Sequence, residues 1–137
     1  MKTFKLQLLV LLLLISVNSC NKDKQHVLGV YYLEGTCKDL LHGPDTFIFP
    51  DHRDVIIKES NNIGLLVNIS IDGTPDFKAS ISKDSLFIPH QVWKNFDKTT
   101  ASFRGEGIIK NDSLFLHYIA RGSFGVFDCD CKGEQIQ

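Results

Sequence analysis

Three cysteines in the body of the chain are the residues most able to do chemistry. Cys129 and Cys131 are separated by one residue, so in an extended strand both thiols project from the same face, as metal ligands must. Asp128 and Asp130 alternate with them and could add carboxylate oxygens. Structural zinc sites usually take four ligands from paired short-spaced motifs, and the chain has only this one, with Cys37 far away. We therefore expect no metal site, and the fate of the three thiols depends on the compartment.

Histidines and one polar run are the other candidates. His117 is predicted in mid-strand, and the remaining four lie in the predicted tether or loops: His26, His42, His52 and His90. Residues 51–54, Asp-His-Arg-Asp, could hold an ion, but such a run more often forms a solvated turn. The chain has no His-Glu-x-x-His, no Gly-x-Ser-x-Gly and no phosphate-binding glycine loop. We expect no catalytic residue and no cofactor.

Two aromatic residues, Trp93 and Phe96, stand in the longest predicted connection of the second half, residues 90–100. Aromatic side chains on a loop at the mouth of a barrel can hold a ligand or a partner. The alternative, which we favour, is that they fold back and close the end of the barrel.

The N-terminus carries a targeting signal. A short basic segment, residues 1–5, precedes a mainly apolar run at residues 6–17. This run has the length of the hydrophobic region of a signal peptide and is too short to span a bilayer. It ends in Val-Asn-Ser-Cys at residues 17–20, which resembles the lipobox of bacterial lipoproteins. The resemblance implies diacylglycerol on the Cys20 sulfur, cleavage between Ser19 and Cys20, and acylation of the new amino group.

This resemblance predicts the location and the domain boundaries. Two or three acyl chains anchor a protein stably, so the folded part needs no membrane-binding surface of its own. After the signal peptide at residues 1–19, residues 20–27 form the lipidated cysteine and a polar tether, and residues 28–137 form one domain. Residue 21 is Asn rather than Asp, which gives no inner-membrane retention signal. We expect a cell-envelope protein of the outer membrane, on its periplasmic face or at the cell surface.

Cysteines in the envelope meet an oxidising compartment. Cys37 lies on the first predicted strand and the other two lie on the last, so in a closed barrel a disulfide from Cys37 to Cys129 or Cys131 would join neighbouring strands. The register presents a difficulty, because full-length antiparallel pairing would place Cys37 nearer Phe124 than Cys131. A disulfide is favoured over free thiols, with the pairing and the role of the third thiol left open.

Composition limits the class of partner. The chain has 15 basic and 16 acidic side chains, and removal of residues 1–19 takes Lys2 and Lys5 and no acid. The remaining 118 residues carry a net charge of −3. Such a chain has no basic excess for phosphate contacts, so we expect no nucleic-acid partner.

Alternating apolar residues predict about eight strands. They cover residues 29–38, 54–59, 64–71, 77–82, 86–88, 101–110, 113–121 and 124–131, and Pro89 ends the fifth. The sequence Asp-Ser-Leu-Phe occurs at residues 84–87 and again at 112–115, which predicts a hairpin turn before each Ser. Gly105 and Gly107 within one strand predict a bend or the close approach of another backbone.

These strands predict an all-β antiparallel meander that closes, or nearly closes, into a barrel, since closure removes exposed strand edges. The pattern resembles lipocalin-like β-barrel lipoproteins. The resemblance rests on Gly-x-Tyr at Gly29 and Tyr31, a hairpin ending in Ile-Pro, a Gly-x-Gly strand and a closing hairpin with cysteine. Tyr31 stands where lipocalins have tryptophan, and residues 40–52 depart from their pattern. The resemblance implies an interior that is filled by side chains or holds one small ligand.

Three functions remain. We expect first a non-catalytic module that binds a small apolar ligand or an envelope protein, and a cavity of about 300 Å³ or more would favour the ligand. The alternative is a structural or assembly subunit of an envelope complex. A hydrolase is least favoured, because no converging acid, base or nucleophile can be named.

Overall fold

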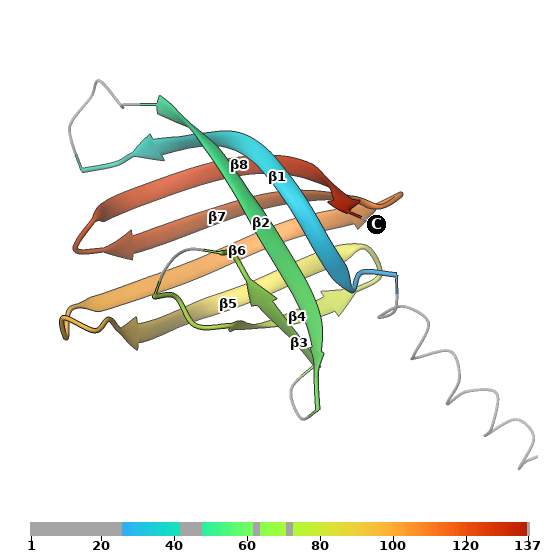
Figure 1. Ribbon diagram of the computed structural model, residues 1–137, viewed down its shortest axis with the longest axis horizontal. Coiled ribbons are helices and arrows are strands. Elements are labelled where there is room, and N and C mark those ends of the chain that lie inside the picture. Colours follow the sequence, from blue (N-terminus) through green and yellow to red (C-terminus); the bar gives the residue numbers. More distant parts are fainter. Residues whose placement is uncertain (1–25, 42–47, 62–63, 71–72, 137) are drawn as a thin grey trace, which may run out of the picture.

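The computed structural model describes residues 26–41, 48–61, 64–70 and 73–136, which form a closed barrel of eight antiparallel strands (Figure 1). The strands are β1 (Gly29–Asp39), β2 (Ile48–Ser60), β3 (Gly64–Asn68), β4 (Phe77–Ser82), β5 (Ser85–Lys94), β6 (Thr100–Lys110), β7 (Ser113–Gly122) and β8 (Gly125–Ile136). Each strand pairs with the next along the chain, and β8 pairs with β1. The predicted all-β meander is confirmed, and the barrel is closed.

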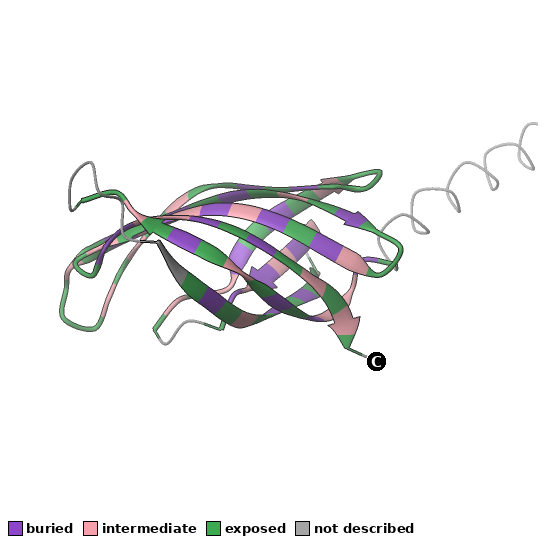
Figure 2. Cartoon of the chain, turned by 90° about the horizontal axis from the view of Figure 1, so that it is seen from above, coloured by how far each residue is buried: buried purple, intermediate pink, exposed green. Residues whose placement is uncertain are grey.

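Side-chain alternation determines which residues form the core. In β7, Leu114, Leu116, Tyr118 and Ala120 are buried, and the residues between them are exposed or half-buried. Figure 2 shows the same alternation of buried and exposed positions along neighbouring strands. Because successive residues of a strand point to opposite faces, the buried set of each strand points into the barrel and the other set faces outward.

Aromatic rings fill much of the interior. The ring of Phe103 stacks on that of Phe77, with centroids 4.4 Å apart, and on that of Tyr118, with centroids 5.2 Å apart. The Tyr31 hydroxyl donates a hydrogen bond of 3.0 Å to the Val27 carbonyl oxygen. Val27, which the sequence analysis assigned to the tether, is completely buried and packs with the barrel core.

The predicted hairpin turns are present. Ser82 pairs with Ser85 across one turn, and Lys110 pairs with Ser113 across the other. Asn111 and Asp112 have φ angles of 51° and 61°. Asn and Asp tolerate these left-handed values better than other residues with side chains, and two-residue hairpin turns of type I′ require them at both central positions.

Glycines, Gly107 and Gly35 among them, allow adjacent backbones to approach closely. A Cβ atom on Gly107 would lie 2.6 Å from the Phe115 carbonyl oxygen, so the close approach predicted for this strand is present. A Cβ atom on Gly35 would lie 2.0 Å from the Asp130 carbonyl oxygen. The pairing of β1 with β8 therefore depends on the absence of a side chain at residue 35.

β5 is longer than the sequence predicts, because Pro89 does not end it. The register between β5 and β6 shifts between Ile88 and Gln91, and such a bulge is where a sheet tolerates a proline, which has no N–H to donate. The Gln91 side chain accepts from the backbone N–H of Lys78 and donates to its carbonyl oxygen, both at 2.9 Å. The predicted connection at residues 90–100 is therefore reduced to residues 95–99.

β2 and β8 also extend beyond their predicted bounds. β2 begins at Ile48 rather than residue 54, and β8 continues to Ile136 rather than ending at Cys131. The segment added to β8, residues 132–136, is mostly polar, and the segment added to β2, residues 48–53, contains the run Pro-Asp-His-Arg, so neither shows apolar alternation. They are strands because each pairs with β1. Residues 48–53 of β2 lie beside residues 33–38 of β1, and residues 132–136 of β8 lie beside residues 30–34.

The predicted signal peptide, Cys20, most of the tether and His42 lie outside the described residues. Within the ranges that are described, no helix is both long and apolar enough to cross a membrane.

Candidate functional site

A buried carboxylate, that of Asp51 on β2, organises one part of the barrel interior. Asp51 is only 5% exposed. The Tyr118 hydroxyl donates a hydrogen bond of 2.6 Å to Asp51 Oδ2. Arg53 Nε donates to the same oxygen at 2.6 Å, and Arg53 Nη2 donates to Oδ1. The Cys131 thiol donates to Oδ2 at 3.5 Å. The charge is therefore buried together with an opposite charge and several hydrogen-bond donors, as a buried ion requires.

The sequence predicts a solvated turn at residues 51–54, and that prediction is wrong, because the whole run lies on β2 and Asp51 is buried. Asp51 and Arg53 continue the inward alternation of Val55 and Ile57 along β2. His52, between them, is exposed. The i, i+2 spacing from the apolar pair was the available signal. It was missed because charged residues are seldom expected to face a barrel interior.

The hydrogen bonds set the ionisation of the cluster. Burial alone would raise the pKa of Asp51, but the hydrogen bonds from Arg53 and Tyr118 and the Arg53 charge outweigh it, and the pKa lies below its ordinary value. Burial and the hydrogen bond to Asp51 raise the pKa of Tyr118. Burial and the Asp51 charge raise the pKa of Cys131 to about 12. At neutral pH the cluster holds one carboxylate, one guanidinium, a phenol and a thiol.

Cys37 and Cys129 form a disulfide between β1 and β8, the two strands that close the barrel. They are register partners, with Cα atoms 4.1 Å apart. Of the two predicted pairings this is the one present, and Cys131 is a free, buried thiol. The expected register difficulty does not arise, because β8 runs on to Ile136 and so places Cys129, not Phe124, opposite Cys37.

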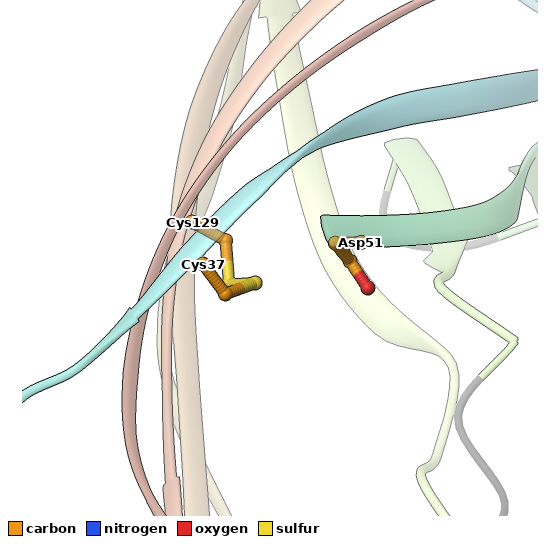
Figure 3. A group of neighbouring side chains, drawn as sticks. All are labelled: Cys37, Asp51 and Cys129. Carbon is orange, nitrogen blue, oxygen red and sulfur yellow. A yellow bond between two sulfur atoms is a disulfide. The ribbon is translucent and has the colours of Figure 1, made fainter. Parts of the chain in front are cut away.

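The disulfide engages two of the thiols that a metal site would need. The sulfurs of Cys37 and Cys129 and a carboxylate oxygen of Asp51 lie within 4.8 Å of one another (Figure 3). The two sulfurs are bonded to each other, so neither is the thiolate that binds metal. Asp128 and Asp130 do not join this group, because their carboxylates approach His117 Nδ1, at 3.6 and 2.9 Å, on the outer face.

A cavity of about 230 Å³ lies beside the Asp51 cluster. Its lining consists of inward-facing residues and one residue of the β7–β8 turn: Cys37, Arg53, Tyr118, Ala120, Phe124, Phe127 and Cys129. The rings of Phe124 and Phe127 are parallel, with centroids 5.9 Å apart, and Phe124 is half exposed at the rim. The Arg53 guanidinium carbon lies 5.7 Å from the centroid of the Tyr118 ring. This arrangement can hold a small apolar molecule against one charged donor group.

A larger hollow, of about 660 Å³, lies on the outer wall of the barrel. Phe87, Ile108 and Phe115 give it an apolar surface, and each is roughly half exposed. The charged side chains at its edge are exposed as well, including Glu34 and Lys132. The inner cavity, by contrast, combines an apolar wall with a buried ion pair, which makes it the better candidate for a specific small ligand.

Trp93 and Phe96 line neither of these hollows. Trp93 packs edge-on against Phe77, with ring centroids 5.3 Å apart, and its Nε1 donates to Asn95 Oδ1 at 3.0 Å. Phe96 is 98% exposed. Trp93 therefore packs against the barrel core while Phe96 faces solvent, so the two aromatic residues do not act as one group, contrary to the prediction. Phe124 and Phe127, which line the cavity, were not singled out.

Comparisons of the chain with protein-family models, with curated proteins and with solved structures found no match. Function is therefore inferred from the geometry of the cavity and from the N-terminal sequence.

Proposed function

We propose that this protein is a non-catalytic binding module of the cell envelope, anchored in the outer membrane by acyl chains on Cys20, whose barrel holds a small ligand in the cavity beside Asp51. The observation that carries the proposal is the apolar cavity with one charged donor, Arg53, in its wall. Apolar pockets with a few converging polar groups are the usual ligand sites of proteins.

The size of the cavity limits the ligand. Its volume of about 230 Å³ is below the range of about 300 to 1,000 Å³ that is usual for drug-sized ligands. A cavity of about 150 Å³ can hold benzene, and by proportion this one holds about nine non-hydrogen atoms. The cavity is also smaller than the about 300 Å³ that we expected to favour a ligand, so the proposal rests on the charged donor in its apolar wall and not on its volume.

The ionisation of the cluster favours binding over catalysis. A general acid or base works best when its pKa lies near the working pH. The pKa of Asp51 is lowered and the pKa values of Tyr118 and Cys131 are raised, so all three move away from neutrality. Groups that keep one protonation state are suited to holding a ligand in a fixed orientation.

Cys20 precedes β1 in the chain, and the cavity lies near the far end of that strand. Residues 20–26 reach at most about 25 Å when extended, which would keep the start of β1 near the membrane. Cys37, in the cavity wall, is close to the other end of this strand. The ligand would then enter from the side facing away from the membrane.

Filling the cavity tests the proposed site. Acetophenone, a probe of suitable size, is titrated into the protein and followed by NMR shifts of the Phe124 and Phe127 rings. Ala120→Leu should weaken binding about tenfold or more, because the added side chain occupies the cavity. Phe115→Ala, on the outer wall, should leave binding unchanged, and near-ultraviolet circular dichroism confirms that both variants fold. Absence of saturable binding, or unchanged binding to Ala120→Leu, contradicts the site.

The anchor is tested separately with Cys20→Ser. The unaltered protein should sediment with envelope membranes, and its intact mass should include acyl chains on a chain that starts at residue 20. The variant should appear in the soluble fraction. Full sedimentation of the variant would refute the lipid anchor without touching the ligand site.

A further inference from the structure

We infer that the cavity takes a neutral molecule with a hydrogen-bond acceptor, such as a carbonyl, ester or amide oxygen, rather than a carboxylate or another anion. This inference rests on the proposed ligand-binding function and describes the ligand of that same site.

Arg53 is the group that would recognise the acceptor. A guanidinium carries five N–H groups, and Asp51 accepts from two of the nitrogens, Nε and Nη2. Within the described part of the chain, Asp51 is the only residue that accepts a hydrogen bond from the Arg53 guanidinium. Its side chain is 18% exposed and lines the cavity, so the remaining N–H groups are available to an occupant. The Tyr118 hydroxyl gives its single hydrogen to Asp51 and has none to offer.

The charge on Arg53 is already balanced. Asp51 forms a two-point ion pair with it and remains ionised, because the hydrogen bonds to its carboxylate keep its pKa low. An anion placed against Arg53 would therefore lose its hydration without gaining an unpaired positive charge, which is unfavourable.

A neutral acceptor does not meet this obstacle. Its oxygen can accept a charge-assisted hydrogen bond from Arg53, and such bonds are stronger than those between neutral groups. The rest of the molecule would lie among Ala120, Phe124 and Phe127, where apolar surface is removed from water. The cavity thus selects for one oxygen on a compact apolar body.

Three aromatic probes of similar size separate the possibilities. Acetophenone offers a neutral carbonyl oxygen, ethylbenzene offers no acceptor, and benzoate is an anion. We expect acetophenone to bind about tenfold more tightly than ethylbenzene, the lower end of what a hydrogen bond to a charged group contributes. We also expect benzoate to bind more weakly than acetophenone. Equal binding of acetophenone and ethylbenzene, or tightest binding of benzoate, overturns the inference.

Removal of the balancing charge should shift the preference toward the anion. Asp51→Asn leaves the guanidinium unpaired, so the ratio of benzoate affinity to acetophenone affinity should rise about tenfold or more. Asp130→Asn makes the same chemical change at an outer-face side chain that is 71% exposed, and should leave the ratio unchanged. An unchanged ratio in Asp51→Asn overturns the inference. If Asp51→Asn does not fold, the order of the three probes with the unaltered protein still decides.

The two proposals fail in different ways. If none of the three probes binds, the small-ligand function itself is contradicted. If they bind in the wrong order, the function stands and only the class of ligand is wrong.

Discussion

Tyr118 on β7 and Asp51 on β2 belong to strands that do not pair, and yet the tyrosine hydroxyl donates a hydrogen bond of 2.6 Å to the carboxylate. The contact crosses the barrel interior and joins residues 67 positions apart in the chain. It helps to keep Asp51 ionised in an apolar core, and Asp51 in turn holds the Arg53 guanidinium at the wall of the cavity.

Loss of this hydrogen bond should destabilise the barrel. Tyr118→Phe leaves one oxygen of the buried carboxylate short of a donor, and the free energy of unfolding should fall by about 1 to 3 kcal/mol. Urea unfolding of the Cys20→Ser protein measures it. Tyr32→Phe, at a half-exposed position, is the matched control and should change stability by no more than about 0.5 kcal/mol. Equal effects of the two substitutions would show that the buried hydrogen bond does not contribute.

The lowered pKa of Asp51 should make stability depend on acidity. The ordinary pKa of the carboxyl group is 3.8, and the folded value is lower. Stability from the ionised form is therefore fully present above the unfolded pKa and is lost as the pH falls through the folded pKa. The difference in unfolding free energy between the unaltered barrel and Asp51→Asn should be constant above about pH 5 and shrink below about pH 4. A difference that does not change over this range would contradict an ionised Asp51.

Chemical modification of the cysteines should distinguish the disulfide from the free, buried Cys131. In the native Cys20→Ser protein, iodoacetamide should modify no cysteine, because Cys131 is buried and its pKa is about 12, which leaves little thiolate. In denaturant without reductant one cysteine should react, and after reduction three. Peptide mapping by mass spectrometry should link Cys37 to Cys129. A link from Cys37 to Cys131 would contradict the pairing.

The alternation of apolar and polar residues along the strands is what allowed the fold to be predicted. Leu65 and Val67 on β3, and Phe77 and Ala79 on β4, face inward as the period of two requires. The turns before Ser85 and Ser113 are set by local residues, and they fix which strands are neighbours. These features depend only on short stretches of sequence, which explains why the meander could be predicted.

The Asp51 cluster could not be predicted in the same way, because its stability arises from contacts between distant strands. Asp51 and Arg53 face inward together, and the groups that make this acceptable, Tyr118 and Cys131, come from β7 and β8. The register of β1 with β8, which selects Cys129 over Cys131, depends on residues beyond Cys131 that carry little apolar signal. Only the closed barrel brings these groups together.

The pairing of β1 with β8 has a consequence for a chain that is synthesised from its N-terminus. While β8 is missing, β1 and β7 each present an unpaired edge, and such an edge can recruit a strand from another molecule. The edge of β1 would therefore stay unpaired until almost the entire polypeptide has been synthesised. A premature stop after residue 124 would leave both edges open and deprive Cys37 of its partner, so the product should aggregate rather than form a smaller barrel.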